Sequence, residues 1–161
     1  SQYNPLHLLP LPLHPADPKP LPTAVTIDPF SDLLWIGTSS GNVSALCSPL
    51  TLTPNVRFPA HGSQPNAFLG GGMTRGVSRI RVTDREVWTL TEGGIGGRRR
   101  GGAPKWNVSD PTRGLRSMSP NPTNSHEVLA GGLNGLMVAN TFRGDIVRRV
   151  GLLLVYAIES L

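Results

Sequence analysis

Short apolar runs separated by turns rich in glycine, serine and threonine recur along this chain. The clearest example is residues 28–46, DPFSDLLWIGTSSGNVSAL, in which an apolar run ends at Gly37 and a second run begins at Val43. The turn between the two runs ends at Gly41. Two such runs on either side of a short Ser/Gly turn are typical of a β-hairpin. The pattern therefore predicts two paired strands, at residues 33–37 and 42–47.

The same pattern returns at residues 86–96, EVWTLTEGGIG, and at residues 127–137, EVLAGGLNGLM. The spacing between these two copies agrees with the roughly 40–45 residues of a WD-type propeller blade, which has four short strands. The first spacing is longer by about the length of a glycine-rich insert at residues 62–73. The pattern predicts an all-β fold, a fragment of a WD-repeat β-propeller with about three blades. The equivalent positions in the three copies are Leu33, Glu86 and Glu127.

The remaining segments supply the other strands of these blades. Residues 76–84, GVSRIRVTD, alternate apolar and polar side chains, which predicts a half-exposed strand with Arg79 and Arg81 on its outer side. The other predicted strands are residues 23–27, 56–58, 86–91, 106–108, 115–119, 127–131, 136–140 and 146–150. The predicted organisation is a Pro-rich leader at 1–22, a partial propeller at 23–150 and an apolar tail at 151–161 that does not continue the blade pattern.

The leader is too rich in proline for a helix or a central strand, and proline at this density favours polyproline II. Its leucines do not make a secretory signal, because the segment has no basic start and its apolar stretch is interrupted by Pro10, Pro12 and His14. We expect a disordered, flexible leader. A proline-rich ligand for another domain is the alternative interpretation.

Composition supports a turn-rich, helix-poor domain, because the 161 residues include 19 glycines and 16 prolines. The net charge of +5 is carried mainly by arginines, since Lys19 and Lys105 are the lysines. A basic balance suits an RNA-facing surface and also suits an ordinary basic piece of a larger protein. We favour the second interpretation, because only 6% of the residues are aromatic and could stack on bases.

A single cysteine, Cys47, excludes a framework of internal disulfides, and its place in a predicted strand indicates a small buried side chain. The sequons at Asn42 and Asn107 are short enough to arise by chance. No apolar run reaches the roughly 18–20 residues that a membrane-spanning helix requires. These features predict a soluble intracellular protein.

The compositional outlier is residues 93–102, GGIGGRRRGG. A phosphate-binding loop is rejected, because the glycine spacing is wrong and Pro104 with Trp106 does not begin a helix. A direct RNA-binding segment would use Arg98, Arg99 and Arg100, together with Arg79 and Arg81 on a neighbouring strand. The interpretation we favour is structural: the third strand of a blade and its turn, with the arginines exposed at the rim.

No constellation in the sequence supports catalysis. The four histidines, at positions 7, 14, 61 and 126, have no metal-ligand spacing to one another or to cysteine, and the acidic residues are scattered. His61 follows a predicted outer strand and is expected to be structural. We therefore predict no catalytic residue, no metal ligand and no cofactor in this chain, which points to a binding or scaffolding module.

Several stretches resemble the catalytic subunit of the Pan poly(A)-specific ribonuclease. Residues 28–41 match the pattern D-P-x-x-[DE]-L-[LI]-W-x-G-x-x-x-G of the first propeller repeat in that family. Residues 57–61, 99–106 and 115–150 agree in the same order. The resemblance covers about residues 25–150, and nothing after residue 150 matches. Its structural repeat markers are Asp28, Pro29, Trp35, Gly37, Gly41, His61, Trp106 and Gly131.

The resemblance implies a long, cytoplasmic protein, found also in P-bodies, that acts in mRNA decay. Members of that family have a seven-bladed N-terminal propeller, a linker that binds a Pan3-type regulatory subunit, and a C-terminal exonuclease that shortens poly(A) tails with divalent metal ions. This chain resembles only about the first three blades, so no catalytic or metal-binding residue is carried over. The implied role is a non-catalytic scaffold that holds the Pan3-type subunit and the poly(A)-ribonucleoprotein near the nuclease.

Two alternatives stay open from the residues alone. One is the direct RNA-binding module through the arginine cluster, and the other is a generic WD-repeat adaptor unrelated to deadenylation. Whichever holds, three blades leave two open sheet faces, because a propeller protects its sheets by closing the ring. We therefore expect marginal stability or association for the isolated chain.

Overall fold

The computed structural model describes residues 21–31, 33–47, 53–59, 76–110 and 114–151, and its regular structure in them is entirely β. These residues contain no helix, and so none that could cross a membrane. The strands are β1 (Pro22–Ile27), β2 (Leu33–Thr38), β3 (Asn42–Cys47), β4 (Thr53–Pro59), β5 (Arg79–Val82), β6 (Glu86–Thr91), β7 (Gly94–Arg99), β8 (Pro104–Ser109), β9 (Leu115–Pro120), β10 (Glu127–Gly132), β11 (Gly135–Asn140) and β12 (Asp145–Val150).

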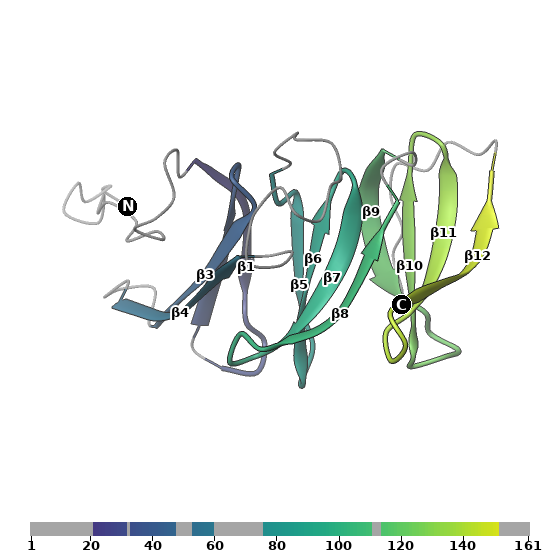
Figure 1. Cartoon of the computed structure of the whole chain (residues 1–161). Coiled ribbons are helices and arrows are strands. Elements are labelled where there is room, and N and C mark those ends of the chain that lie inside the picture. Colours follow the sequence, from purple (N-terminus) through teal and green to yellow (C-terminus); the bar gives the residue numbers. More distant parts are fainter. Residues whose placement is uncertain (1–20, 32, 48–52, 60–75, 111–113, 152–161) are drawn as a thin grey trace, which may run out of the picture.

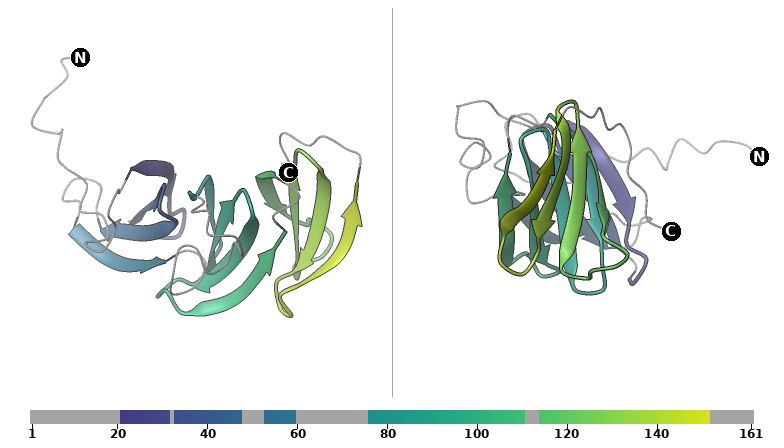
Figure 2. Two further views of the ribbon diagram at one scale, coloured as in Figure 1. Left: turned by 45° about the horizontal axis from the view of Figure 1, so that its top comes forward. Right: turned by 90° about the vertical axis from the view of Figure 1, so that its right-hand side faces the viewer.

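The strands form three four-stranded antiparallel sheets, each built from strands that follow one another in the chain (Figure 1). We call them blade 1 (β1–β4), blade 2 (β5–β8) and blade 3 (β9–β12). The three sheets stand side by side in an arc, as the left view of Figure 2 shows. An arc of four-stranded meanders is the arrangement of propeller blades. The predicted fold class, a fragment of a WD-repeat propeller with about three blades, is confirmed.

The repeat inferred from the sequence coincides with the strands. Leu33, Glu86 and Glu127 are the first residues of β2, β6 and β10, the second strand of each blade. The predicted hairpin at the start of the chain is also present, with Gly37 paired to Val43. Its turn ends at Gly41, whose φ of 85° lies in the left-handed region that favours glycine.

One predicted strand is shorter than expected. The alternating pattern of residues 76–84 predicted a single strand, whereas β5 covers only Arg79–Val82. The segment before it joins two blades instead, because the Val77 N–H donates to the Thr38 carbonyl of blade 1 at 3.0 Å. Several predictions lie outside the described residues: the leader up to residue 20, His61, the insert at 62–73, the side chain of Cys47, and the tail from residue 152.

The hydrophobic core is divided between the two junctions where neighbouring blades face each other. The junction of blades 1 and 2 contains Trp35, Val43, Ala45, Val77 and Val87. The junction of blades 2 and 3 holds the larger cluster, whose fully buried members include Leu90, Ile95, Val128, Ala130, Met137 and Ala139. Each blade thus buries its apolar side chains against the next blade, which is how sheets packed face to face form a core.

The open face of blade 1 carries exposed apolar side chains. Val25 and Ile27 pair with Ile36 and Leu34, so they lie on the face of the sheet that is turned away from Trp35 and blade 2. Val25 is 60% exposed and Ile27 is 71% exposed. Ile36 on the same face is fully buried, so the exposed apolar side chains of this face lie in β1.

Candidate functional site

The arginine cluster does not form one exposed patch. Arg98 and Arg99 are the last residues of β7, and Arg100 begins the turn to β8. Arg98 is only 7% exposed and donates to the Gly102 carbonyl at 2.8 Å, while Arg99 is exposed. The expectation that all three arginines are exposed at the rim is therefore wrong for Arg98, which is buried, and for Arg100, which is half-buried. Their place in the third strand and its turn is as predicted.

Strand alternation explains why these arginines separate. Arg98 pairs with Val87, a member of the core at the junction with blade 1, whereas Arg99 pairs with Glu86 on the opposite face of the sheet. Arg81 lies on the same face as Arg99, because it pairs with Trp88, and Arg79 is exposed two positions before it on β5. The structure thus places the candidate RNA contacts on two faces of blade 2.

Arg100 links blade 2 to blade 1 through Asp28, in a contact that we call the Asp28 bridge. Its guanidinium forms an ion pair with the Asp28 carboxylate and also donates to Ser31 Oγ at 3.0 Å. A further bond reaches the Thr83 carbonyl at 3.1 Å, and the guanidinium carbon lies 5.8 Å from the centre of the Phe30 ring. Arg100 is therefore committed to protein contacts.

Asp28 is the centre of this bridge because its turn and the following strand direct two donors at it. The Phe30 amide donates to Oδ1 at 2.8 Å, and the Trp35 indole N–H donates to Oδ2 at 3.0 Å. The residue is 3% exposed. Burial raises the pKa of the carboxyl, but the hydrogen bonds, with that from Trp35 first, lower it more, so the Asp28 pKa lies below its ordinary value.

Blade 2 has a second buried carboxylate, Glu86, with three partners that we call the Glu86 cluster. The indole N–H groups of Trp88 and Trp106 donate to Oε2 at 2.8 and 3.2 Å, and Lys105 Nζ lies 2.5 Å from Oε1. The two indole rings meet edge to face at 5.9 Å. Burial raises the pKa of Glu86, but the hydrogen bonds, first that from Lys105, lower it more, so the carboxyl is ionised at neutral pH.

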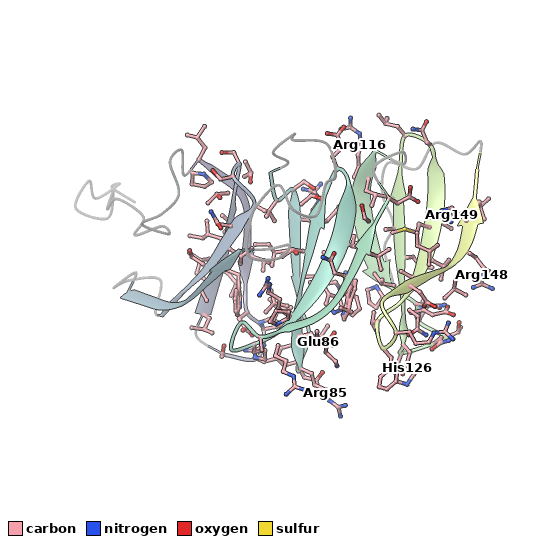
Figure 3. All side chains as sticks on the ribbon, in the orientation of Figure 1. Arg85, Glu86, Arg116, His126, Arg148 and Arg149 are labelled. Atoms are coloured by element: carbon pink, nitrogen blue, oxygen red, sulfur yellow. The ribbon has the colours of Figure 1, made fainter. Side chains whose placement is uncertain are left out.

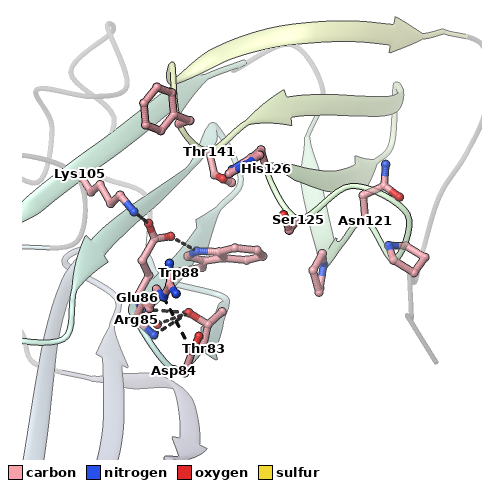
Figure 4. Close-up of a pocket in the computed structure, with 13 residues that line it drawn as sticks. Thr83, Asp84, Arg85, Glu86, Trp88, Lys105, Asn121, Ser125, His126 and Thr141 are labelled. Carbon is pink, nitrogen blue, oxygen red and sulfur yellow. Dashed lines mark hydrogen bonds and ion pairs between the residues drawn. The ribbon is translucent and has the colours of Figure 1, made fainter.

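The Glu86 cluster forms one wall of a groove between blades 2 and 3, which we call the interblade groove. Figure 3 places Arg85, Glu86 and His126, which line the groove, at the lower edge of the view. The cavity has a volume of about 730 Å³. In Figure 4, the lining side chains come from the β5–β6 turn and blade 2 on one side and from the turns of blade 3 on the other. They are Thr83, Asp84, Arg85, Glu86, Trp88, Lys105, Pro120, Asn121, Pro122, Ser125, His126, Thr141 and Phe142.

The blade 3 side of the groove presents exposed rings. Phe142, in the β11–β12 turn, is 77% exposed, and its ring lies 6.2 Å from that of His126 in an edge-to-face contact. The Asn140 side chain holds this turn, because Oδ1 accepts the Phe142 and Arg143 amides at 2.9 and 2.8 Å. Two neighbouring exposed rings therefore lie at the blade 3 edge of the groove.

The charges around the groove balance. Lys105 is paired with Glu86, and Arg85 lies 3.8 Å from Asp84 in an exposed ion pair. The described part of the chain contains no group of His, Cys, Asp and Glu side chains arranged to hold a metal ion. The groove is therefore suited to binding a ligand of low charge.

The other repeat markers occupy structural positions. Gly37 lies against blade 2, where a Cβ would come within 2.6 Å of Val77 Cγ1. Trp106 lies across Gly97, to which it is paired in the sheet. Pro29 is in the turn of the Asp28 bridge, and Gly131 lies buried in β10, paired to Leu136 and Ser117.

Sequence reasoning missed the roles of Glu86, Lys105 and Phe142. The first could have been found, because Glu86 precedes Trp88 by two residues in a strand and so shares its face. Phe142 gave no signal, since its exposure depends on the turn that carries it. The interblade groove was not predictable from the chain, because it arises from the packing of two blades.

Comparison with known proteins agrees with this architecture. No protein-family model matches the chain. The chain is 67% identical over 151 residues to the PAN2-PAN3 deadenylation complex catalytic subunit PAN2 of Cryptococcus neoformans, which covers 92% of the chain. The corresponding protein of Yarrowia lipolytica is 33% identical over 130 residues. The chain spans only 13% and 11% of the lengths of these two relatives.

Solved structures show the same fold. The Pan2 WD40 domain of Neurospora crassa superposes with a TM-score of 0.72 at 22% identity, covering 89% of this chain and 43% of that domain. The C-terminal WD40 domain of Sif2 gives a TM-score of 0.66 at 13% identity, covering 83% of this chain and 38% of the other. The resemblance to the WD-repeat propeller region of the Pan deadenylase catalytic subunit is therefore confirmed, and it is a partial match.

Proposed function

We propose that this chain is the partial propeller of a deadenylation-complex subunit and serves that complex as a non-catalytic protein-interaction scaffold. The observation that carries the proposal is the 67% identity over 151 residues to a PAN2 catalytic subunit. At that identity over nearly the whole chain, the relative and this chain are expected to share a role as well as a fold. The fold alone would not suffice, because WD-repeat propellers serve many functions.

The non-catalytic role is supported by the part of the relative that matches. The superposition falls on the WD40 domain of a Pan2 protein, so the matched part is a propeller, and we propose that its surface serves the complex by binding other proteins. By the same resemblance we propose that the partners are a Pan3-type regulatory subunit and the poly(A)-ribonucleoprotein, and that the protein works in the cytoplasm, including P-bodies. A divalent metal ion belongs to the nuclease region of such proteins, and this chain has no expected cofactor.

The contacts of the arginine cluster argue against the alternative of a direct RNA-binding module. Arg98 is buried and Arg100 is committed to the Asp28 bridge, so neither presents its guanidinium to a phosphate. Sequence-independent binding of RNA depends on several basic side chains that can pair with phosphates along one surface. Of the five candidate arginines, only Arg79, Arg81 and Arg99 share one face of blade 2, so the basic surface is smaller than the cluster in the sequence indicated.

The test is purification of the native gene product with an affinity tag at its own locus. We expect it to bring down a poly(A)-shortening activity and a Pan3-type subunit. A mass measurement of the same product is expected to give a protein far larger than 17.2 kDa. Purified material that lacks poly(A)-shortening activity would overturn the proposal in favour of a generic WD-repeat adaptor.

The scaffold role has its own test in the same cells. Deleting residues 21–151 from the native protein should leave the nuclease able to shorten naked poly(A). The same deletion should slow shortening of poly(A) covered by its binding protein and lengthen cellular poly(A) tails. If the deleted protein is equally active on both substrates, the propeller is not the scaffold.

A further inference from the structure

The interblade groove is a feature that the propeller fold does not require. Neighbouring blades normally close against each other with apolar side chains, as at the junction of blades 1 and 2. Between blades 2 and 3 the apolar cluster closes the interior, but the lower edge stays open over about 730 Å³. A volume of that size is in the range of sites that bind a drug-sized molecule or a few residues of a peptide.

The lining favours a particular kind of ligand. The exposed rings, His126 and Phe142, are on the blade 3 side, while Trp88 on the blade 2 side lines the groove but is only 4% exposed. Pro120 at the end of β9 and Pro122 in the β9–β10 turn add rigid apolar surface. Grooves lined with aromatic rings bind extended peptides that contain proline, because the rings pack against the pyrrolidine and the neighbouring aliphatic side chains.

The polar groups at the rim also suit a peptide. A peptide in polyproline II conformation makes no internal hydrogen bonds, so its carbonyl oxygens need donors from the protein. The Arg85 side chain is 85% exposed and provides N–H donors at the blade 2 rim. Ser125 provides a hydroxyl on the opposite side of the groove. Carbonyl groups of a ligand lying along the groove would therefore meet a donor on each side.

The charges disfavour a nucleic acid in this groove. Its charged lining consists of two basic and two acidic side chains, Arg85 and Lys105 with Asp84 and Glu86, each basic group near an acidic one. A phosphate backbone would be repelled by the carboxylates as much as it is attracted by the cations. A ligand with few charges is the better complement.

We propose that the interblade groove binds an extended peptide segment of a partner protein, a segment rich in proline and leucine and poor in charge. This inference rests on the proposed function, because it assigns one surface of the scaffold to one class of partner. The peptide packs its apolar side chains on Phe142, His126 and Pro122. It presents its carbonyl groups to Arg85 and Ser125.

The test measures binding of three probes to the 161-residue chain. The first is a fluorescein-labelled peptide of sequence NPLHLLPLPLHP, copied from residues 4–15 as an available example of this chemistry. The second is the same peptide with its leucines replaced by aspartate, and the third is a labelled twelve-residue oligoadenylate. We expect fluorescence anisotropy to show saturable binding of the first probe alone. Tighter binding of oligoadenylate would overturn the proposal.

Substitutions locate the site. We expect Phe142→Ser to raise the Kd at least about tenfold, as is typical when a central aromatic contact is lost. Ser125→Arg, which fills the groove with a long side chain, should have a similar effect. Phe30→Ser is the matched control, because Phe30 is also an exposed phenylalanine, 58% exposed, and does not line the groove. Equal Kd values for all three variants would place the peptide elsewhere and overturn the proposal.

The leader of this chain is the competing occupant, because it carries the same peptide sequence. A variant with serine at Leu8, Leu9, Leu11 and Leu13 removes that competition. If the probe binds only to this variant, the groove belongs to the chain's own leader and the proposal of a partner is wrong. None of these measurements involves poly(A) shortening, so a failure here is distinct from a failure of the deadenylation role.

Discussion

The two blade junctions each contain a buried carboxylate, a tryptophan that donates to it and a basic partner, but the basic partner comes from a different blade in each case. At each, a buried carboxylate accepts a hydrogen bond from a tryptophan in the second strand of a blade: Asp28 from Trp35, and Glu86 from Trp88. At the first junction the basic partner, Arg100, comes from the next blade, so the ion pair joins blades 1 and 2. At the second the basic partner, Lys105, belongs to blade 2 itself.

This difference distinguishes the lower edges of the two junctions. The Asp28 bridge ties the lower edge of blade 1 to blade 2. The partners of Glu86 all belong to blade 2, and the interblade groove lies beside this cluster. Blade 3 still approaches blade 2 next to the groove, because a Cβ at Gly144 in the β11–β12 turn would lie 3.6 Å from Trp106 Cβ. An ion pair does join blades 2 and 3, between Arg149 Nε and Asp110 at 3.2 Å, but neither residue lines the groove. The basic partner of the buried carboxylate thus crosses the first junction, whereas at the second it stays within blade 2.

The largest expected effect is at the Asp28 bridge. Asp28→Ala removes the acceptor of the Trp35 indole and of the Phe30 amide, and it leaves Arg100 without its carboxylate. Losing one member of a buried ion pair with its hydrogen bonds costs about 3 kcal/mol. We expect the free energy of unfolding to fall by that amount in urea titrations followed by tryptophan fluorescence.

The matched control for this substitution is Asp84→Ala, because Asp84 is 70% exposed and its ion pair with Arg85 spans 3.8 Å. It should change the free energy of unfolding by less than about 0.5 kcal/mol. Equal effects of the two substitutions would show that the Asp28 bridge does not hold blades 1 and 2 together.

A smaller loss is expected from Gly37→Ala, which tests how tightly the first junction is packed. The new Cβ would lie 2.6 Å from Val77 Cγ1 and 2.7 Å from Val77 Cβ, an atom next to the backbone that cannot rotate away. Overpacking of this kind costs about 2 kcal/mol. The control is Gly101→Ala, since a Cβ at Gly101 meets nothing within 4 Å. A stability loss in the control as large as that in Gly37→Ala would contradict the packing argument.

Acid should weaken both junctions. The pKa of Asp28 and that of Glu86 lie below their ordinary values, so the unfolded chain takes up protons at these carboxyls before the folded chain does. Their contribution to stability is complete at neutral pH and is lost as the pH falls through and below the ordinary carboxyl range. We expect the urea midpoint to decrease from pH 6 to pH 3. Glu86→Gln should reduce the slope, and a slope equal to that of the parent chain would exclude Glu86 as a source.

The sequence predicted the blades better than it predicted their junctions. Strand positions follow from local signals, such as the apolar run after Leu33 and the turn that ends at Gly41, which act within a few residues of the chain. Arg98 shows the limit of that reasoning. The glycine- and arginine-rich composition around Arg98 indicated an exposed position at the rim. In the structure Arg98 pairs with Val87, so its side chain lies on the face of the sheet that blade 1 covers. Register and the neighbouring blade, rather than residue type, decided its burial.

The Asp28 bridge also shows that sequence reasoning does not reveal contacts between blades. The sequence marked Asp28 and Trp35 as features of one repeat, and the structure joins them by a hydrogen bond. Nothing in the chain connected Asp28 to Arg100, which lies 72 residues further on. Contacts between blades depend on how the sheets are arranged in space, so sequence spacing does not reveal them.

The smallest expected effect is at the open junction, from Phe142→Ser. The Phe142 ring is 77% exposed and gains little from burial, so the free energy of unfolding should change by less than about 0.5 kcal/mol. The measurement is the same urea titration, with Asp28→Ala as the reference for a side chain on which a junction depends. Substituting a residue that is retained for stability would lower the free energy of unfolding several times more. A decrease above about 1.5 kcal/mol would mean that Phe142 helps to close blade 3 onto blade 2. A negligible loss, combined with weaker peptide binding, would mean that this turn keeps a phenylalanine in solvent for a partner rather than for the fold.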